Sequence, residues 1–588
     1  MHILGINTGF NASAVLLKNN EVIFGIQEER LSRIKNQPGF PTLAVKACLE
    51  AEKLSADDLS MVAVASTSGK IPKDRESELH KFQHRYDLIK QKWFNGRKNP
   101  LTALVRRYVN KIDCLTKSTG NGLGLQDHLK ANDLLEKVHC FDHHTCHAAA
   151  AYYGLARNKG EKHLIFTLDG GGDGRTSAVF IGHNNQLQLI AESNSFSPAC
   201  LYAHLTYISG FLPHEHEYKL MGLAPYAQRK YAEKVRDSLY RFIGLDEKNP
   251  LVFTNTSKYP SVDNSGGPQK HQLIEEIFRS VLNVRFDTLA AGLQMLAEEV
   301  VVRWIREGIQ QTGIQRVLLS GGFFMNVKAN QLISELPEVK SVNCFPSCGD
   351  ETNAFGAAYL GYEKLRQKAN PDVKFLNFCV GPQPNCDDMI QRKYQDKICV
   401  EKMSQINAKI VDLLVAGKIV ARCSGPMEFG VRALGNRSIL AAPDDVRVIN
   451  KINAAIKKRD FWMPFAPAVL QDKAELVIDI PLSVREAYSP YMMFTFQTKP
   501  EKFDQMIAGT QQMDKSARAQ LVSRETYPDF YDIIEGFFQK TGIPAVLNTS
   551  FNLHGFPIVC TAEEAIEVYL NSALDVLVVD DYMITRRQ

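Results

Sequence analysis

The sequence predicts an α/β protein built from two domains. Three observations lead to this prediction: the length, repeated units of strand, glycine turn and helix, and a proline-containing break at residues 366–388. At 588 residues the chain is too long for a single hydrophobic core. Strands that pass through a glycine turn into a helix are typical of α/β domains, which bind ligands at the ends of their strands.

The expected elements begin with the first residues of the chain. Residues 2–7 and 13–29 are predicted as strands, with a turn at Asn19-Asn20. Three later segments are a strand and glycine turn "HLIFTLDGGGDG" (163–174), a strand followed by a double glycine and a helix (315–333), and a small-residue helix (351–365).

A linker is predicted where periodicity is lost. Residues 366–388 contain three prolines, so we assign the domains to 1–370 and 386–588 with a linker at 371–385. A second α/β pattern follows the linker. Residues 86–120 are basic and are predicted as a helical insertion, for which a solvated face is the simpler interpretation and a substrate contact the alternative.

Composition limits the classes of partner. The net charge of +4 argues weakly against a nucleic-acid-coating or polybasic membrane protein. No apolar run approaches the roughly 20 residues that span a bilayer, and the first residues lack the cationic segment of a signal peptide. The 12 cysteines show no paired spacing beyond "CFPSC" (344–348), which matches no common zinc motif. We therefore expect a cytoplasmic protein with reduced thiols and no membrane or nucleic-acid partner.

Histidines are concentrated in "FDHHTCHAAAAYY" (141–153). On a helix His143 and His147 share a face, so both imidazoles can bind one metal, whereas His144 is rotated by about 100° from His143. The remaining ligands must come from elsewhere; Asp169, at a strand end, and Asp350, ahead of a helix, are candidates. The alternative is that these histidines cap or pack the helix.

Glycine turns and cations indicate sites for anions. "DGGGDG" (169–174) and "SGG" (320–322) allow the backbone to approach a phosphate, and with the first-strand loop they suit a nucleotide cleft of the actin and sugar-kinase type. Arg432 and Arg437 lie beside glycines rather than acidic residues, and arginine favours bidentate phosphate recognition. Further cations of this half are Arg422, Lys457, Lys458, Arg459, Arg518 and Arg524. Surface ion pairs are the alternative for any single arginine.

Seven motifs occur in one order along the chain: "QEERLSRIKN", "DHHTCHAAAAYY", "EYKLMGLAPY", "LSGGFFMN", "EFGVRALGNRSIL", "IKKRDFWMPFAPAVL" and "LNTSFNLHGFPIV". With these motifs the chain resembles the O-carbamoyltransferases of antibiotic and nodulation-factor biosynthesis. The resemblance implies an N-terminal actin-like (ASKHA, Kae1-like) domain and a C-terminal YrdC-like α/β domain. It also implies formation of carbamoyl adenylate from carbamoyl phosphate and ATP with Mg²⁺, followed by carbamoyl transfer to a hydroxyl of a small-molecule natural product.

The resemblance also implies roles for individual residues. A metal, expected to be Fe(II), would be held by His143, His147, Asp169 and Asp350. Nucleotide-holding residues would be Gly171, Gly172, Gly321, Gly322 and Asn326, with Arg437 and Asn552 assigned to phosphates. The catalytic cations would be Arg432, Lys457 and Arg518, with Lys35 near the transfer cleft.

Several positions depart from the family pattern. Asn11-Ala12 stands where the family often has His-Asp, so the base is open between Asp173, metal assistance and the substrate itself. Met463 and His554 replace frequent arginines, and Val431 replaces a proline. The alternative functions are a threonylcarbamoyl-type transferase acting on tRNA, an actin-like carbohydrate kinase, and a nucleotide-binding regulatory module. The hydroxyl acceptor and the oligomeric state are not predicted.

Overall fold

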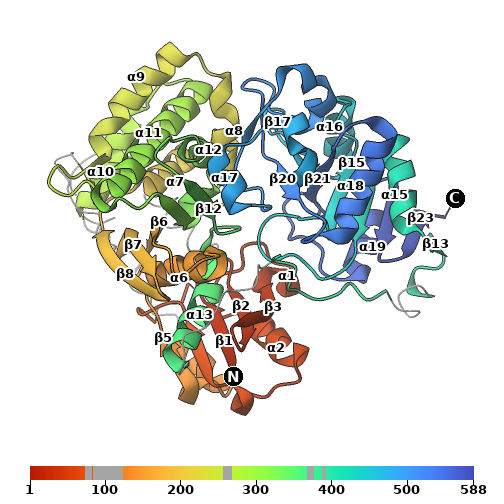
Figure 1. The fold of residues 1–588 in the computed structure, drawn as a ribbon, viewed down its shortest axis with the longest axis horizontal. Coiled ribbons are helices and arrows are strands. Elements are labelled where there is room, and N and C mark those ends of the chain that lie inside the picture. The colour runs from red at the N-terminus through yellow and green to blue at the C-terminus, as the bar shows by residue number, and fades with distance from the viewer. Residues whose placement is uncertain are drawn as a thin grey trace, which may run out of the picture.

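The structure, a computed structural model, describes residues 1–69, 71–72, 83, 124–255, 268–366, 377–386 and 392–587. The N-terminal elements, red to green in Figure 1, form one side of the molecule, and the C-terminal elements, in blue, form the other. The predicted insertion at 86–120 lies outside the described residues. No helix in the described part of the chain is long and apolar enough to cross a bilayer.

The first sheet starts from the opening hairpin of the chain. Its order is β3-β2-β1-β4-β5, antiparallel within β1 to β3 and parallel from β1 through β4 to β5. The strands are β1 (His2–Asn7), β2 (Ser13–Lys18), β3 (Glu21–Gln27), β4 (Met61–Val64) and β5 (Val138–Cys140). Asn19 and Asn20 have φ values of 49° and 73°, the left-handed values of a two-residue hairpin turn, so the predicted turn is confirmed.

The second sheet repeats the pattern of the first. Its order is β8-β7-β6-β11-β12, antiparallel in β6 to β8 and parallel at β11 and β12. The strands are β6 (His163–Gly172), β7 (Arg175–His183), β8 (Gln186–Ser193), β11 (Arg316–Ser320) and β12 (Ser341–Cys344). This duplicated five-stranded arrangement is that of the actin-like fold, as predicted.

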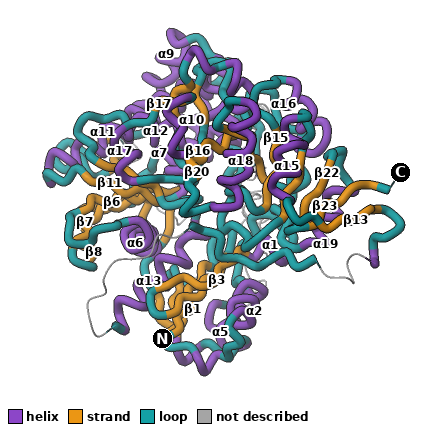
Figure 2. The backbone as a smooth tube through the Cα atoms, turned by 45° about the vertical axis from the view of Figure 1, so that its right-hand side comes forward, coloured by secondary structure: helices purple, strands orange, loops and turns teal. Residues whose placement is uncertain are grey.

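Two small-residue helices pack between the sheets. Helix α13 (Asn353–Leu365) packs on β1, and α6 (His143–Leu155) packs on β6 and β11; both lie between the sheets in Figures 1 and 2. The helices contact each other so closely that a Cβ added to Gly356 would lie 1.8 Å from the carbonyl oxygen of Cys146. The four alanines of α6 are all buried, because the helix packs on α13 and also on β6 and β11. This packing places the preceding histidines at the end of β6.

A group of helices covers the second sheet. They are α7 (Pro198–Ile208), α8 (Glu217–Leu223), α9 (Arg229–Leu239), α10 (Pro268–Ser280), α11 (Phe286–Thr312) and α12 (Val327–Ser334). Trp304 of α11 is fully buried, and its ring meets that of Phe166 in β6 edge to face at 4.8 Å. Helix α8 lies at the side of this group that faces the C-terminal domain (Figure 1).

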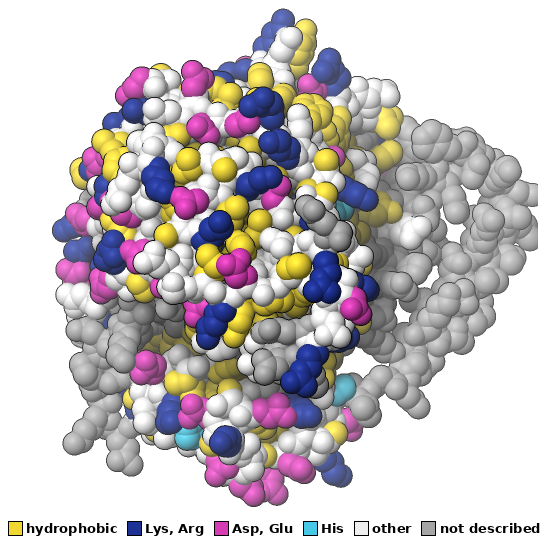
Figure 3. Space-filling view, turned by 90° about the vertical axis from the view of Figure 1, so that its right-hand side faces the viewer, with side chains coloured by type: hydrophobic (Ala, Val, Ile, Leu, Met, Phe, Trp, Pro, Cys, Tyr) yellow, Lys and Arg dark blue, Asp and Glu magenta, His cyan; other side chains and the backbone are white. Residues whose placement is uncertain are grey.

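The C-terminal domain contains a mixed eight-stranded sheet of order β13-β23-β22-β14-β15-β21-β16-β20. The strands are β13 (Ile398–Lys402), β14 (Val420–Cys423), β15 (Arg437–Ala441), β16 (Ala466–Leu470), β20 (Gln520–Val522), β21 (Ala545–Ser550), β22 (Val576–Val579) and β23 (Tyr582–Arg586). Its helices are α15 (Ile406–Val415), α16 (Arg447–Ile452), α18 (Pro528–Thr541) and α19 (Ala562–Leu570). On the face of this domain shown in Figure 3, basic and acidic side chains are interspersed. The predicted second α/β domain is confirmed.

Buried hydrogen bonds join the two parts of the chain. A three-stranded sheet of β17 (Ile478–Asp479), β18 (Phe496–Thr498) and β19 (Ser516–Ala517), with helix α17 (Leu482–Ala487), borders the N-terminal part. Asn330 donates to the carbonyl oxygen of Met493 at 2.8 Å, and Thr495 Oγ1 donates to Gln331 Oε1 at 2.7 Å. Of the predicted linker, residues 377–385 are described, and the Gly25 amide donates to Val380 O at 3.0 Å.

Candidate functional site

Four predicted ligands converge at the edge of the second sheet. His143 and His147 lie one turn apart on α6, whose first turn is fixed because the Asp142 carboxylate accepts the Thr145 amide at 2.9 Å. Asp169 ends the apolar part of β6, and Asp350 precedes α13. One ligand atom from each of the four side chains lies within 4.8 Å of the other three.

The geometry fits one divalent cation. Asp169 Oδ2 is 3.6 Å from His143 Nε2 and 3.2 Å from His147 Nε2, and Asp350 Oδ1 is 3.6 and 3.8 Å from the same two atoms. His143 Nε2 is buried without a hydrogen-bond partner among the described residues. Two imidazoles and two carboxylates are a donor set for iron, zinc or manganese, so the residues present fit a metal.

The surrounding residues orient the two imidazoles. Ser320 Oγ lies 3.3 Å from His147 Nδ1, and Asn353 Nδ2 lies 3.4 Å from His143 Nδ1. Such contacts fix the ring orientation of metal ligands. Sequence reasoning missed both residues, although Ser320 begins the "SGG" turn (320–322) and Asn353 lies in the predicted helix 351–365.

The pKa values of His143 and His144 are shifted in opposite directions. Burial lowers the pKa of His143, but the nearby carboxylates of Asp350 and Asp169 outweigh burial and raise it to about 9. For His144, burial and the neighbouring His143 and His147 hold the pKa well below its usual value. His144 Nδ1 lies 2.9 Å from Thr167 Oγ1, away from the four ligand atoms. The prediction that His144 stands aside from the pair agrees with this placement.

The predicted glycines pack against the ligand residues. A Cβ on Gly172 would lie 2.3 Å from Cγ of His143, and a Cβ on Gly321 would lie 2.4 Å from the Leu168 carbonyl oxygen. A Cβ on Gly322 would lie 3.3 Å from Asp169 Oδ1, and Gly171 has a φ of 133°. The two turns therefore allow the strands to approach each other behind the metal-ligand cluster.

Two polar residues of this domain, Asn326 and Asp173, form hydrogen bonds with other residues of the protein. Asn326 caps α12 by accepting the Ala329 amide at 3.1 Å and exchanges two hydrogen bonds of 3.0 Å with Gln294. Asp173, one candidate base, accepts hydrogen bonds at 2.9 to 3.1 Å from the amides of Thr67, Ser68 and His143. These bonds hold the loop after β4 against α6, which is a structural role.

The first-strand loop borders the ligand cluster without supplying a base at Asn11-Ala12. Both residues are buried, and Ala12 has no titratable group. A Cβ on Gly9 would lie 3.1 Å from Asp350 Oδ2, and the ring of Phe10 stacks on His214 at 5.0 Å. The loop therefore forms one wall beside Asp350.

A second group, the cation cluster, consists of Arg432, Lys457, Arg459 and Arg518. Lys457 is buried, and its Nζ donates to Asn552 Oδ1 at 2.7 Å and Ser550 Oγ at 3.1 Å. Arg459 donates to Thr549 Oγ1 at 3.1 Å. None of the four cations forms an ion pair with a carboxylate that the structure describes.

The pKa values of three cations in the cluster are lowered because the side chains are buried without a described counter-charge. Burial lowers the pKa of Arg432 to about 10, assisted by the charge of Arg459. Burial also holds the pKa of Lys457 and of Arg518 well below their usual values, with Arg459 adding to both shifts. Nε of Arg432 and of Arg518 is buried and has no described hydrogen-bond partner. Uncompensated cations in a sheltered site are an arrangement suited to an anionic ligand.

Elements of the N-terminal domain border the cation cluster. Tyr218 of α8 interacts electrostatically with Arg432, Arg459 and Arg518. The next residue, Lys219, forms a 3.0 Å ion pair with Asp460, which holds α8 against the segment carrying Arg459. Tyr218 lies more than 200 positions from these cations in the sequence, and only the "EYKLMGLAPY" motif marked it.

The remaining predicted cations have different surroundings. Arg437 is completely buried, and its guanidinium donates to backbone carbonyls of Pro382, Ser424, Gly425, Asn436 and Cys560. It belongs to the core, so we do not include it among the anion-binding residues. Lys35 Nζ is 3.6 Å from Glu215 Oε2, and its charge lowers the pKa of Lys457. It therefore lies on the N-terminal side of the same cluster.

Comparison with known proteins matches both parts of the chain. The family model "Carbamoyltransferase N-terminus" matches residues 2–359, and "Carbamoyltransferase C-terminus" matches residues 411–586. An uncharacterized protein of Methanocaldococcus jannaschii, MJ1051, is 30% identical over 99% of both chains. Nodulation protein NolNO of Sinorhizobium fredii is 29% identical over 98% of this chain and 79% of its own.

Solved structures share less with the chain. Component A of (R)-2-hydroxyglutaryl-CoA dehydratase from Acidaminococcus fermentans aligns with a TM-score of 0.33 at 14% identity, covering 62% of this chain and 98% of that chain. A nucleotide-bound HypF aligns with a TM-score of 0.31 at 11% identity, covering 63% of this chain and 56% of that chain.

Proposed function

Because the chain belongs to the carbamoyltransferase family, we propose that it is an ATP-dependent O-carbamoyltransferase whose acceptor is a hydroxyl of a small molecule. The observation that carries the ATP-dependent part is the cation cluster, in which four cations lack a described carboxylate partner. Carbamoyl phosphate and the triphosphate of ATP are anions that would supply the missing charge.

The proposed first half-reaction takes place at the cation cluster. Water cleaves carbamoyl phosphate to carbamate and phosphate, and a carbamate oxygen then attacks the α-phosphorus of ATP. The bond from the α-phosphorus to the bridging oxygen breaks, so pyrophosphate leaves and carbamoyl adenylate remains. Arg432 and Arg518 are assigned to the phosphate oxygens, where fixed cations offset the charge that builds up in the transition state. Asn552 accepts from Lys457 and orients its ammonium group.

The proposed second half-reaction takes place beside the metal-ligand cluster. The acceptor hydroxyl oxygen attacks the carbamoyl carbon of the adenylate, the bond to the phosphate oxygen breaks, and AMP leaves with the bonding electrons while the hydroxyl proton is released. His143, His147, Asp169 and Asp350 would hold the metal, which supplies Lewis-acid polarisation and a template when bound.

The test separates the two half-reactions. The protein is incubated with ATP and radiolabelled carbamoyl phosphate, and carbamoyl adenylate and pyrophosphate are quantified. We expect Arg432→Ala to abolish both products, whereas His143→Ala should chiefly stop transfer from supplied adenylate. Arg524→Ala is the matched control, since Arg524 is exposed and paired with Asp532 at 2.6 Å, and it should leave both steps unchanged. Absence of both products with metal-loaded wild-type protein would contradict the proposed function.

A further inference from the structure

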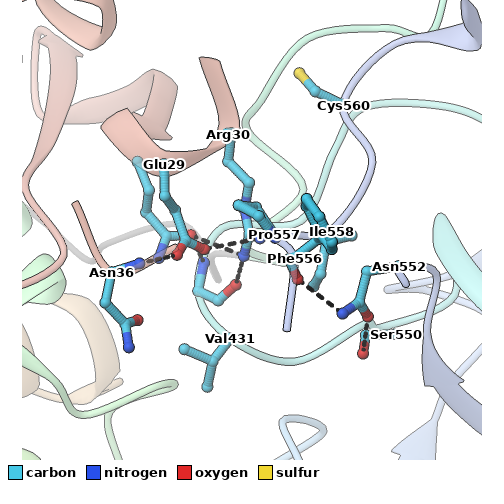
Figure 4. Close-up of polar contacts among 12 residues, drawn as sticks. Glu29, Arg30, Asn36, Val431, Ser550, Asn552, Phe556, Pro557, Ile558 and Cys560 are labelled. Atoms are coloured by element: carbon cyan, nitrogen blue, oxygen red, sulfur yellow. Dashed lines mark hydrogen bonds and ion pairs between the residues drawn. The ribbon is translucent and has the colours of Figure 1, made fainter. Parts of the chain in front are cut away.

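Residues of the N-terminal domain hold the backbone that carries Arg432. Helix α1 (Glu28–Ser32) and the residue before it lie against the loop at 430–431. The Gly430 amide donates to Gln27 Oε1 at 3.0 Å, and Arg30 Nη2 donates to the Gly430 carbonyl oxygen at 2.5 Å. The backbone amide and the carbonyl oxygen of Gly430 are therefore both hydrogen-bonded to side chains of the N-terminal domain. Figure 4 shows the side chain of Arg30 that makes one of these bonds.

A third contact comes from the segment that precedes Asp350. The Val431 amide donates to Ser347 Oγ at 3.2 Å, and this hydroxyl in turn donates to the carboxyl group of Glu351. Gly430 has a φ of 97°, and a Cβ there would lie 2.8 Å from Cβ of Ser347. The two loops therefore approach so closely that only glycine is accommodated.

The contacting side chains are themselves held rigidly. Arg30 is 2% exposed, donates to Gln27 Oε1 at 3.1 Å and forms a 2.9 Å ion pair with Glu29. Glu29 also accepts the Asn36 amide at 2.7 Å (Figure 4). Gln27 is 1% exposed, and its Nε2 has no described partner, so its acceptor oxygen is the group that the contact uses.

Arg432 depends on its backbone for its position. It forms no ion pair with a described carboxylate, and its Nε has no described partner, so no side-chain contact of that kind fixes its guanidinium. Displacement of a binding group by about 1 Å can cost roughly a hundredfold in rate. The neighbouring residues Gly430 and Val431 are therefore the points at which the N-terminal domain can set the geometry of the cation cluster.

We propose that Gln27, Arg30 and Ser347 are positioning residues that hold Arg432 in place for phosphate binding in the C-terminal domain. The inference rests on the proposed function and adds to it that the anion site requires groups from both domains. The residues that follow Ser347 lead to Asp350, so the same loop contributes to the metal-ligand cluster and to the position of Arg432.

The test compares two substitutions at one position. Gln27→Met has a similar length but no acceptor, and Gln27→Glu keeps the oxygen that accepts from Gly430 and Arg30. For pyrophosphate release, kcat/KM for carbamoyl phosphate should fall by about 30- to 100-fold in Gln27→Met and stay within about threefold of wild type in Gln27→Glu. Transfer from supplied carbamoyl adenylate should be unchanged in both. Equal rates in Gln27→Met and wild type, or no recovery in Gln27→Glu, would overturn the proposal.

Three further experiments keep the result unambiguous. Thr495→Val removes a buried hydrogen bond between the domains away from Arg432; if it lowers kcat/KM as much as Gln27→Met, domain stability and not positioning explains the loss. If Gln27→Met does not fold, Ser347→Ala takes its place and should lower kcat/KM at least tenfold. Calorimetric binding of inorganic pyrophosphate needs no turnover, and Gln27→Met should weaken it about tenfold. A wild-type protein that binds pyrophosphate but makes no adenylate contradicts the proposed function alone.

Discussion

Substitution of Gly172 by alanine should displace His143 from the metal-ligand cluster although no ligand residue is itself substituted. The added Cβ would lie 2.3 Å from Cγ, 2.4 Å from Cδ2 and 2.5 Å from Nδ1 of the His143 ring. Non-bonded carbon atoms pack at roughly 3.5 to 4.0 Å, so the ring must move by more than about 1 Å. Metal–ligand distances tolerate about 0.2 Å. His143 in this variant therefore cannot share an ion with the other three ligands.

The expected magnitude follows from losing one ligand of four. Changing a residue that merely orients a ligand costs about 10- to 100-fold in metal affinity, so displacement of His143 should cost at least about 100-fold. The assay is calorimetric titration of metal-free protein with Fe(II), Mn(II) and Zn(II), together with elemental analysis of the purified protein. Gly170→Ala is the control in the same turn, because a Cβ there has no neighbour within 4 Å, and it should bind metal within about twofold of wild type.

Two outcomes would refute this reasoning. Wild-type metal affinity in Gly172→Ala would mean that His143 is not a ligand. An equal loss in Gly170→Ala would mean that flexibility of the turn, and not the position of His143, controls the site.

Three further changes have expected outcomes. Burial raises the pKa of Glu298 to about 7, so the free energy of unfolding should fall as pH rises from about 4.5 to about 7, by at most about 3 kcal/mol. Glu298→Gln should flatten this dependence in thermal unfolding at pH 5 and pH 8, and an unchanged slope would exclude Glu298 as its cause. Gly356→Ala should lower the free energy of unfolding by about 3 kcal/mol, because its Cβ would meet Cys146 O at 1.8 Å. Urea unfolding measures this loss, and an unchanged free energy of unfolding would show that α6 and α13 can separate to admit the methyl group. Arg518→Met removes a cation without a described counter-ion, so it should raise the melting temperature while abolishing adenylate formation; a lower melting temperature would indicate that the cation is compensated.

Much of the local structure was predictable because it depends on neighbouring residues. Strands at residues 2–7 and 13–18, the turn at Asn19-Asn20 and the helix after the double glycine follow from alternation, left-handed asparagine and glycine punctuation. Asp169 and Asp350 were proposed as joint ligands because both were expected at the edge of a sheet, and the structure brings one ligand atom of each within 4.8 Å of those of His143 and His147. The assignment of the metal and the catalytic roles stays a prediction.

The amino-acid sequence by itself determined the α/β class, the repeated strand pattern, and which residue types were available for a metal and for phosphate. The tertiary structure alone decided how those residues are used. Arg432 and Arg437 lie five positions apart in one motif. Arg437 donates to backbone carbonyls in the core, whereas Arg432 belongs to the cation cluster, which has no described counter-charge. Asn326 caps a helix, Asp173 binds backbone amides, and Gln27 reaches a glycine about 400 positions away. The physical reason is that a polar group's role depends on whether the folded chain brings it a partner, and those partners come from segments far apart in the sequence.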